Sequence, residues 1–110
     1  MKFDVIATTN FKREIKKLLK KYPSLHNEYL SLVENLEHSP KQGTSIGRNC
    51  FKIRLSIKSK GKGMSGGARV ITCFVLVEKS VYLLSIYDKS MKENITDKQL
   101  GDFLDGISDE

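Results

Sequence analysis

The sequence has few of the residues that build metal and thiol sites, since it contains only two cysteines and two histidines. Cys50 and Cys73 lack CxxC spacing, and His26 and His38 lack the i, i+4 spacing that brings two ligands to one metal. This pattern favours buried free thiols in a reducing compartment over a zinc site or a disulfide framework. No metal or other cofactor is expected, and the histidines are expected at the surface.

Long apolar runs are scarce as well. No stretch approaches the roughly 18 apolar residues of a membrane span, and the N-terminus, MKFDVIATTN, lacks the apolar core of a signal peptide. We therefore expect a cytoplasmic protein with no membrane partner. No histidine lies near a plausible serine or cysteine nucleophile motif, and residues 61–66 fit GxGxxG but precede a strand. These observations argue against a hydrolase triad and a dinucleotide site.

Positive charge is present in excess. The net charge is +6, and residues 1–62 contain 14 of the 19 basic but only 5 of the 13 acidic side chains. Such a surplus favours a polyanionic partner such as RNA. Hydrophobic residues make up 39% of the 110 residues, which is enough to fold one domain, 1–110.

Hydrophobic periodicity predicts an α+β domain in the order βααβββα. Asn10 and Ser24 are the expected caps of the first two helices, Pro40 follows the second, and Thr96 with Gln99 matches a capping box for a short C-terminal helix. Segregated helices and strands imply an antiparallel meander with a helical hairpin packed on one face, after an N-terminal strand. The expected strands are 3–7, 50–58, 68–77 and 81–87, and the expected helices are 11–22, 25–38 and 97–107.

Basic and apolar residues alternate in the strand that begins at Cys50. This alternation predicts one apolar face and one cationic face that carries Lys52 and Arg54. Like charges on adjacent strands repel one another, so Lys52, Arg54 and Arg69 on one face are unfavourable unless a polyanion binds there. The alternative is a sheet face that is merely solvated.

A cationic face can cleave RNA without histidine, because the ribose 2′-hydroxyl is a nucleophile beside the phosphate that it attacks. The protein then has to position the strand, accept a proton and stabilise charge. A lysine crowded by other cations gives up its own proton more readily and can accept the 2′-proton. Arginines can hold the phosphoryl oxygens as their charge grows.

Four segments, in this order, resemble the RelE/ParE superfamily of bacterial toxins, and most closely its HigB-like ribosome-dependent branch. They are KLLKKYPSLHNEYLSLVENL, FKIRLSIKSKGKG, SGGARVITCF and YLLSIYDKS. The resemblance spans most of the chain and implies the RelE-like toxin fold. It also implies a toxin of a type II toxin-antitoxin system, an mRNA interferase that cuts translated mRNA in the ribosomal A site. The implied partners are that mRNA, ribosomal RNA and a cognate antitoxin protein.

The resemblance also implies residue roles. Lys52 and Arg54 match paired basic residues on the second strand, Arg69 matches an arginine that opens the third, and Lys89 matches a basic residue after the fourth. By this similarity Lys52 or Arg54 acts as base or phosphate ligand, Arg69 stabilises transition-state charge, and Lys89 serves the leaving 5′-oxygen. The further expected RNA contacts are Lys58, Lys60, Lys62 and Tyr87.

The sequence departs from the pattern at two positions. Ile95 replaces a tyrosine that stacks on the substrate base in some members, so Tyr87 is the candidate substitute. Met64 occupies a loop position where relatives of this branch tend to carry lysine or arginine, which weakens the loop's hold on RNA. Two other functions stay open: a ParE-like topoisomerase poison without chemistry, and an RNA-binding protein without catalysis. Retention of all the cationic strand residues argues against the poison.

Overall fold

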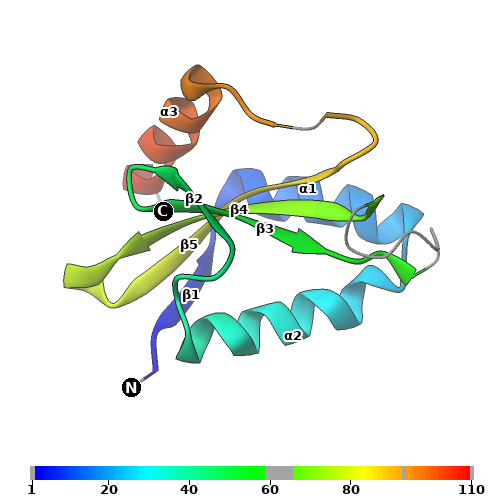
Figure 1. Cartoon of the computed structure of the whole chain (residues 1–110), viewed down its shortest axis with the longest axis horizontal. Coiled ribbons are helices and arrows are strands. Elements are labelled where there is room, and N and C mark those ends of the chain that lie inside the picture. The colour runs from blue at the N-terminus through cyan, green and yellow to red at the C-terminus, as the bar shows by residue number, and fades with distance from the viewer. Residues whose placement is uncertain (1, 59–65, 93, 110) are drawn as a thin grey trace.

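A five-stranded sheet lies at the centre of the structure, with helices on both of its faces (Figure 1). The computed structural model describes residues 2–58, 66–92 and 94–109. The elements in chain order are β1 (Asp4–Ala7), α1 (Thr9–Lys21), α2 (Leu25–His38), β2 (Thr44–Gly47), β3 (Cys50–Leu55), β4 (Ala68–Val75), η3 (Leu76–Glu78), β5 (Ser80–Asp88), α3 (Asp97–Asp105) and η4 (Gly106–Asp109).

The strands follow the order β1-β5-β4-β3-β2 across the sheet. Strands β2 to β5 form an antiparallel meander, and β1 adds to its far edge by pairing parallel with β5, so that Asp4 lies opposite Ser80. The predicted α+β class and the predicted meander are therefore confirmed. Among the described residues, no helix is both long and apolar enough to cross a membrane.

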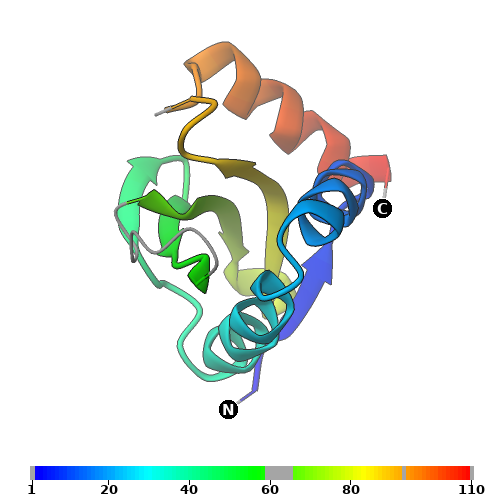
Figure 2. The same cartoon turned by 90° about the vertical axis from the view of Figure 1, so that its right-hand side faces the viewer.

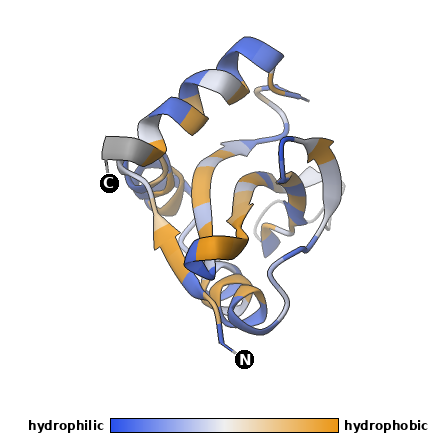
Figure 3. Ribbon diagram, turned by 90° about the vertical axis from the view of Figure 1, so that its left-hand side faces the viewer, coloured by the Kyte–Doolittle hydropathy of each residue, from blue (hydrophilic) through white to orange (hydrophobic). Residues whose placement is uncertain are grey.

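Two apolar clusters hold the layers together, one on each face of the sheet. Helices α1 and α2 pack Phe11, Leu25 and Leu36 against one face, as the predicted helical hairpin requires. Helix α3 packs Leu100 against the other face and lies on the opposite side of the sheet from α2 (Figure 2). The central strands are coloured mostly hydrophobic in Figure 3, whereas α3 carries both kinds of residue along its length. A sheet covered on both faces accounts for this difference.

The helix caps differ in part from those expected. Thr8, not Asn10, caps α1, because the Thr8 hydroxyl accepts from the Phe11 amide while it donates to the Leu83 carbonyl at 2.9 Å. Ser24 stands before α2 but makes no capping bond with its side chain. The predicted capping box of α3, in contrast, is confirmed, since Thr96 and Gln99 exchange both side-chain bonds.

The strands also depart from expectation. A short extra strand, β2, precedes β3, so the order is βααββββα. Strand β3 ends at Leu55 because its partner β4 begins only at Ala68, directly opposite. Strand β4 ends at Val75, since residues 76–78 turn as η3 and expose Leu76 and Val77, whose apolar side chains had suggested a longer strand.

Candidate functional site

The register of three neighbouring strands places three of the four predicted catalytic residues, Lys52, Arg54 and Arg69, on one face of the sheet. Arg54 on β3 lies directly opposite Arg69 on β4, and Arg69 lies opposite Tyr87 on β5. Lys52 stands two residues before Arg54, so it projects from the same face of the sheet. We call Lys52, Arg54, Arg69 and Tyr87 the basic row. This face is the one that α3 partly covers, because Ile71 and Tyr87 belong to the α3 cluster.

Burial differs sharply within the basic row. The Arg54 side chain is exposed, whereas Arg69 keeps only 3% of its surface accessible. The Arg69 Nη1 donates to the Ala68 carbonyl at 3.1 Å. Two cations therefore lie opposite each other, one in solvent and one largely withdrawn from it.

The segment that follows β5 returns across this face and fixes Lys52. The Lys52 Nζ donates to the Asn94 Oδ1 at 2.7 Å, and Asn94 stands just before α3. A small cavity of about 60 Å³ lies beside this contact, between the sheet and the start of α3. Its lining residues are Ile46, Lys52, Ile71, Asn94, Ile95, Thr96, Asp97 and Leu100.

The Tyr87 ring is covered rather than open. It is 6% exposed, and the Lys92 Nζ lies 4.8 Å from its centroid in a cation–π contact. A base that stacks on Tyr87 therefore has to displace Lys92 first. Lys92 in turn adds a cation to the same end of the sheet.

Lys89 and Lys58 lie at the ends of the strands that carry the basic row. The Lys89 amide donates to the Gly67 carbonyl at 3.0 Å, which places its backbone beside the start of β4. Gly67 has no room for a side chain, since a Cβ there would stand 1.9 Å from the Leu55 carbonyl oxygen. Lys58 is exposed beyond the end of β3. The other predicted loop positions, Lys60, Lys62 and Met64, lie outside the described residues.

A β-bulge in β5 sets the direction of Tyr87. Ile71 pairs with Ser85 but Thr72 pairs with Leu83, so Leu84 is an extra residue on β5. Glu14 on α1 supports this bulge, because its Oε1 accepts from the Ser85 Oγ at 2.7 Å and from the Ile86 amide at 3.3 Å. Bulges commonly redirect a side chain in this way.

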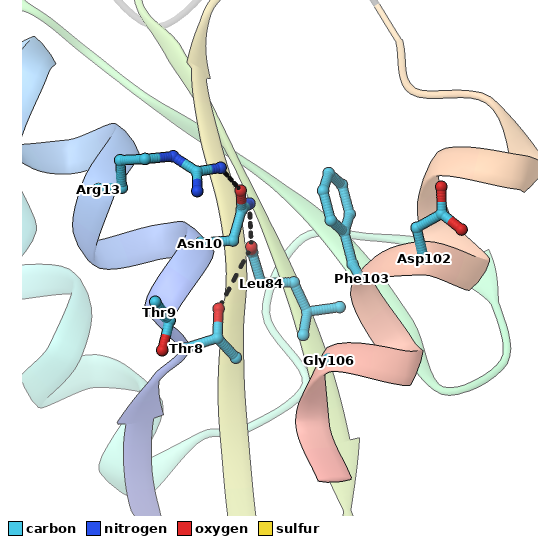
Figure 4. A pocket seen from close by; sticks show the side chains of 8 residues that line it. All are labelled: Thr8, Thr9, Asn10, Arg13, Leu84, Asp102, Phe103 and Gly106. Atoms are coloured by element: carbon cyan, nitrogen blue, oxygen red, sulfur yellow. Dashed lines mark hydrogen bonds between the residues drawn. The ribbon is translucent and has the colours of Figure 1, made fainter. Parts of the chain in front are cut away.

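A larger cavity, of about 500 Å³, lies away from the basic row, between α1, β5 and α3 (Figure 4). The Asn10 Nδ2 donates to the Leu84 carbonyl at 2.9 Å on its wall, and Arg13 bonds to Asn10. Among the described residues that line it, Arg13 alone carries a positive charge. Its volume is larger than that of the cavity beside Lys52, but its lining contains fewer basic side chains than the basic row. The residues that line it are Thr8, Thr9, Asn10, Arg13, Leu84, Asp102, Phe103 and Gly106.

Sequence reasoning missed three residues that shape the candidate site. Asn94 and Lys92 belong to a segment without periodic pattern, so nothing in the sequence placed them over the sheet. Glu14 looks like one more charged residue on a helix surface. The available signal was the position of the Glu14 carboxylate next to the apolar residue Ile15. A half-buried carboxylate needs hydrogen-bond partners, so this position indicates contacts within the fold.

Comparison with solved structures identifies the fold. The structure of a double arginine-to-alanine mutant of the Escherichia coli toxin RelE in the free state matches with a TM-score of 0.62, covering 96% of this chain and 97% of that one at 14% identity. The isolated Escherichia coli RelE toxin matches with a TM-score of 0.52, covering 94% and 97% at 19% identity. The chain has a RelE-like fold.

The similarity to both RelE structures covers the sheet and its helices. At 14% and 19% sequence identity, it shows a shared fold and nothing further. No known family profile matches the sequence. The structures therefore do not assign roles to individual residues of this chain.

Proposed function

We propose that this chain is the toxin of a type II toxin-antitoxin system and a ribosome-dependent endoribonuclease that cleaves translated mRNA. The observation that carries the proposal is Arg54 directly opposite Arg69, with Lys52 on the same face of the sheet. The RelE-like fold supports it, since both matched structures are of a toxin. The protein acts as a single domain in the cytoplasm, with mRNA in the ribosomal A site, ribosomal RNA and a cognate antitoxin as partners.

The facing arginines carry a cost of charge repulsion, because like charges directly opposite one another on adjacent strands destabilise a sheet. A phosphodiester bound at the exposed Arg54 offsets this repulsion, because its oxygens accept charge-assisted hydrogen bonds. An anion that binds there is held where negative charge increases during cleavage.

The chemistry is transesterification. The 2′-oxygen forms a bond to phosphorus, the bond from phosphorus to the 5′-oxygen breaks, and the product ends in a 2′,3′-cyclic phosphate. Lys52 accepts the 2′-proton, since arginine stays protonated and cannot serve as a base. Arg54 and Arg69 stabilise the phosphoryl oxygens, and Lys89 donates a proton to the leaving 5′-oxygen. Lys58, Lys60, Lys62 and Tyr87 contact the flanking RNA.

The test is primer extension on a message in a reconstituted translation system, with the unsubstituted chain and single variants. Arg54→Ala and Lys89→Ala should each slow cleavage by about 100-fold, because each removes a group that acts on the transition state. Lys16→Ala is the matched control, since it removes one exposed positive charge from α1 on the other side of the sheet. Cleavage by this variant should stay unchanged.

Three outcomes would contradict the proposal. A message with a 2′-deoxy residue at the cut site should resist cleavage, so equally fast cutting would exclude 2′-attack. Growth arrest with intact messages and a DNA-damage response would indicate a topoisomerase poison. Ribosome or RNA binding with no cleavage would indicate an RNA-binding protein without catalysis.

A further inference from the structure

The two cysteines lie directly opposite each other at one end of the β3–β4 pair. Cys50 pairs with Cys73, and both are buried free thiols. The Phe74 amide donates to the Asn49 carbonyl at 2.9 Å, one residue outside the pair, so the cysteines occupy a non-hydrogen-bonded position of the ladder. Facing residues at such positions have Cα atoms about 4.5 Å apart, within the range of about 4.4–6.8 Å that a disulfide spans.

The two thiols also contact each other, and the contact makes them unequal. A hydrogen bond between the side chains lowers the pKa of Cys73 and raises the pKa of Cys50, so Cys73 loses its proton more readily than Cys50. Exposure points the same way, because Cys73 keeps 6% of its surface accessible and Cys50 keeps none. Cys73 is therefore the thiol that a small oxidant reaches first and the one that ionises more readily.

A metal site does not explain this arrangement. Among the described residues, no group of three or more histidine, cysteine, aspartate or glutamate side chains is placed to hold an ion. The neighbours of the cysteines in the α3 cluster are apolar or aromatic, such as Ile71, Tyr82 and Leu84. The pair is thus an isolated dithiol.

We propose that Cys50 and Cys73 form a reversible intramolecular disulfide that joins β3 to β4. With hydrogen peroxide as oxidant, the Cys73 thiolate attacks one oxygen, the O–O bond breaks, and hydroxide leaves to give a sulfenic acid on Cys73. The Cys50 sulfur then loses its proton, attacks the Cys73 sulfur and expels that oxygen as water. The dithiol loses two electrons and the peroxide gains them. Reduction by an external thiol restores the pair.

The location of this bond gives it a consequence for the basic row. Three facing pairs follow one another along β3 and β4 and project from the same face of the sheet: Cys50–Cys73, Lys52–Ile71 and Arg54–Arg69. A covalent bond in the first pair fixes the register of the third pair, in which like charges face each other. The inference stands whether or not the chain cleaves RNA, since it concerns two thiols and two strands.

The test uses the purified full chain, reduced and then treated with hydrogen peroxide without denaturant. Free thiols should fall from two to none while the protein stays monomeric, and mass spectrometry of an unreduced digest should find the Cys50 peptide linked to the Cys73 peptide. Dithiothreitol should restore both thiols. Thiols that persist, sulfinic acid without a cross-link, disulfide-linked dimers, or a link that forms only in urea would each overturn the proposal.

Single variants test which sulfur reacts first. Cys50→Ser keeps the more accessible Cys73 and should still form a sulfenic acid that a dimedone probe traps, whereas Cys73→Ser should be trapped far more slowly. Equal trapping would contradict the assigned order.

The melting temperature gives a separate measurement: peroxide should raise it by about 5 °C or more in the unsubstituted chain and leave the double variant Cys50→Ser/Cys73→Ser unchanged. An unchanged or lower value in the unsubstituted chain would exclude a stabilising cross-link.

Discussion

Arg54 and Arg69 face each other across two strands, yet they make different demands on the fold. Arg54 is exposed, so its charge costs little except repulsion from its neighbour. Arg69 is 3% exposed and bonds to the Ala68 carbonyl, so the fold packs around it. A loss of function after substitution of Arg69 is therefore partly a loss of stability.

The two arginines should separate in a denaturation experiment. Arg69→Ala should lower the free energy of unfolding by about 2 kcal/mol, because it leaves a cavity and removes the bond to Ala68. Arg54→Ala should change it by less than about 0.5 kcal/mol, since only an exposed side chain and a repulsive contact are lost. Urea midpoints measured by circular dichroism check both values. Equal midpoints would contradict the difference in burial.

At the scale of elements, the bulge in β5 depends on a helix. Glu14 on α1 accepts from Asn10 at 2.8 Å as well as from Ser85 and the Ile86 amide, so one carboxylate oxygen gathers three donors. These bonds hold the extra residue that turns Tyr87 toward Arg69. The position of an aromatic side chain in the candidate site thus rests on a residue from the opposite face of the sheet.

Substitution of Glu14 should release the bulge. Glu14→Ala should cost about 1–3 kcal/mol, because partly buried donors lose their acceptor, and hydrogen exchange at the Ile86 amide should become faster. Glu34→Ala removes an exposed carboxylate of α2 and serves as the control, with a change of less than about 0.5 kcal/mol. If both variants unfold at the same urea concentration, Glu14 does not hold the bulge.

Elements with strong periodicity were predictable from the sequence, and those defined by contacts were not. The alternation after Cys50 correctly predicted one apolar face of β3 and a second face with Lys52 and Arg54, and the structure packs the apolar face against α1 and α2. Strand β2 was missed because TSIG is short and mostly exposed, and pairing with β3 alone defines it. Asparagine is a residue type that suits a cap, which favours Asn10 in the sequence, yet in the structure the Thr8 hydroxyl contacts both Phe11 and Leu83.

At the scale of the whole molecule, the distribution of basic residues along the chain and the fold of the sheet together determine where positive charge gathers. The excess of basic residues in 1–62 attracts polyanions at long range, and the basic row concentrates part of the positive charge on one face of the sheet. In the sequence, the basic row is visible only as basic residues that alternate with apolar ones. Its contacts with Lys92 and Asn94 form because the chain returns across the sheet after β5, which the sequence pattern does not predict.

The salt dependence of RNA binding should report this concentration of charge. For a single-stranded RNA blocked by 2′-deoxy substitution, each phosphate contact contributes about −0.7 to the slope of log K against log salt concentration. Arg54→Ala should therefore make the slope shallower by about 0.7, whereas Lys16→Ala should leave it unchanged. Fluorescence anisotropy over a salt series measures the slopes. Equal slopes for the two variants would show that general charge, not the basic row, binds the RNA.

The parallel pairing of β1 with β5 has a consequence for when the sheet can be completed. Asp4–Ala7 is synthesised well before its neighbour in the sheet, Ser80–Asp88. A nascent chain cannot complete the sheet, or set Arg69 beside Tyr87, until that late segment has emerged. The basic row is therefore assembled only after the ribosome has translated the β5 segment.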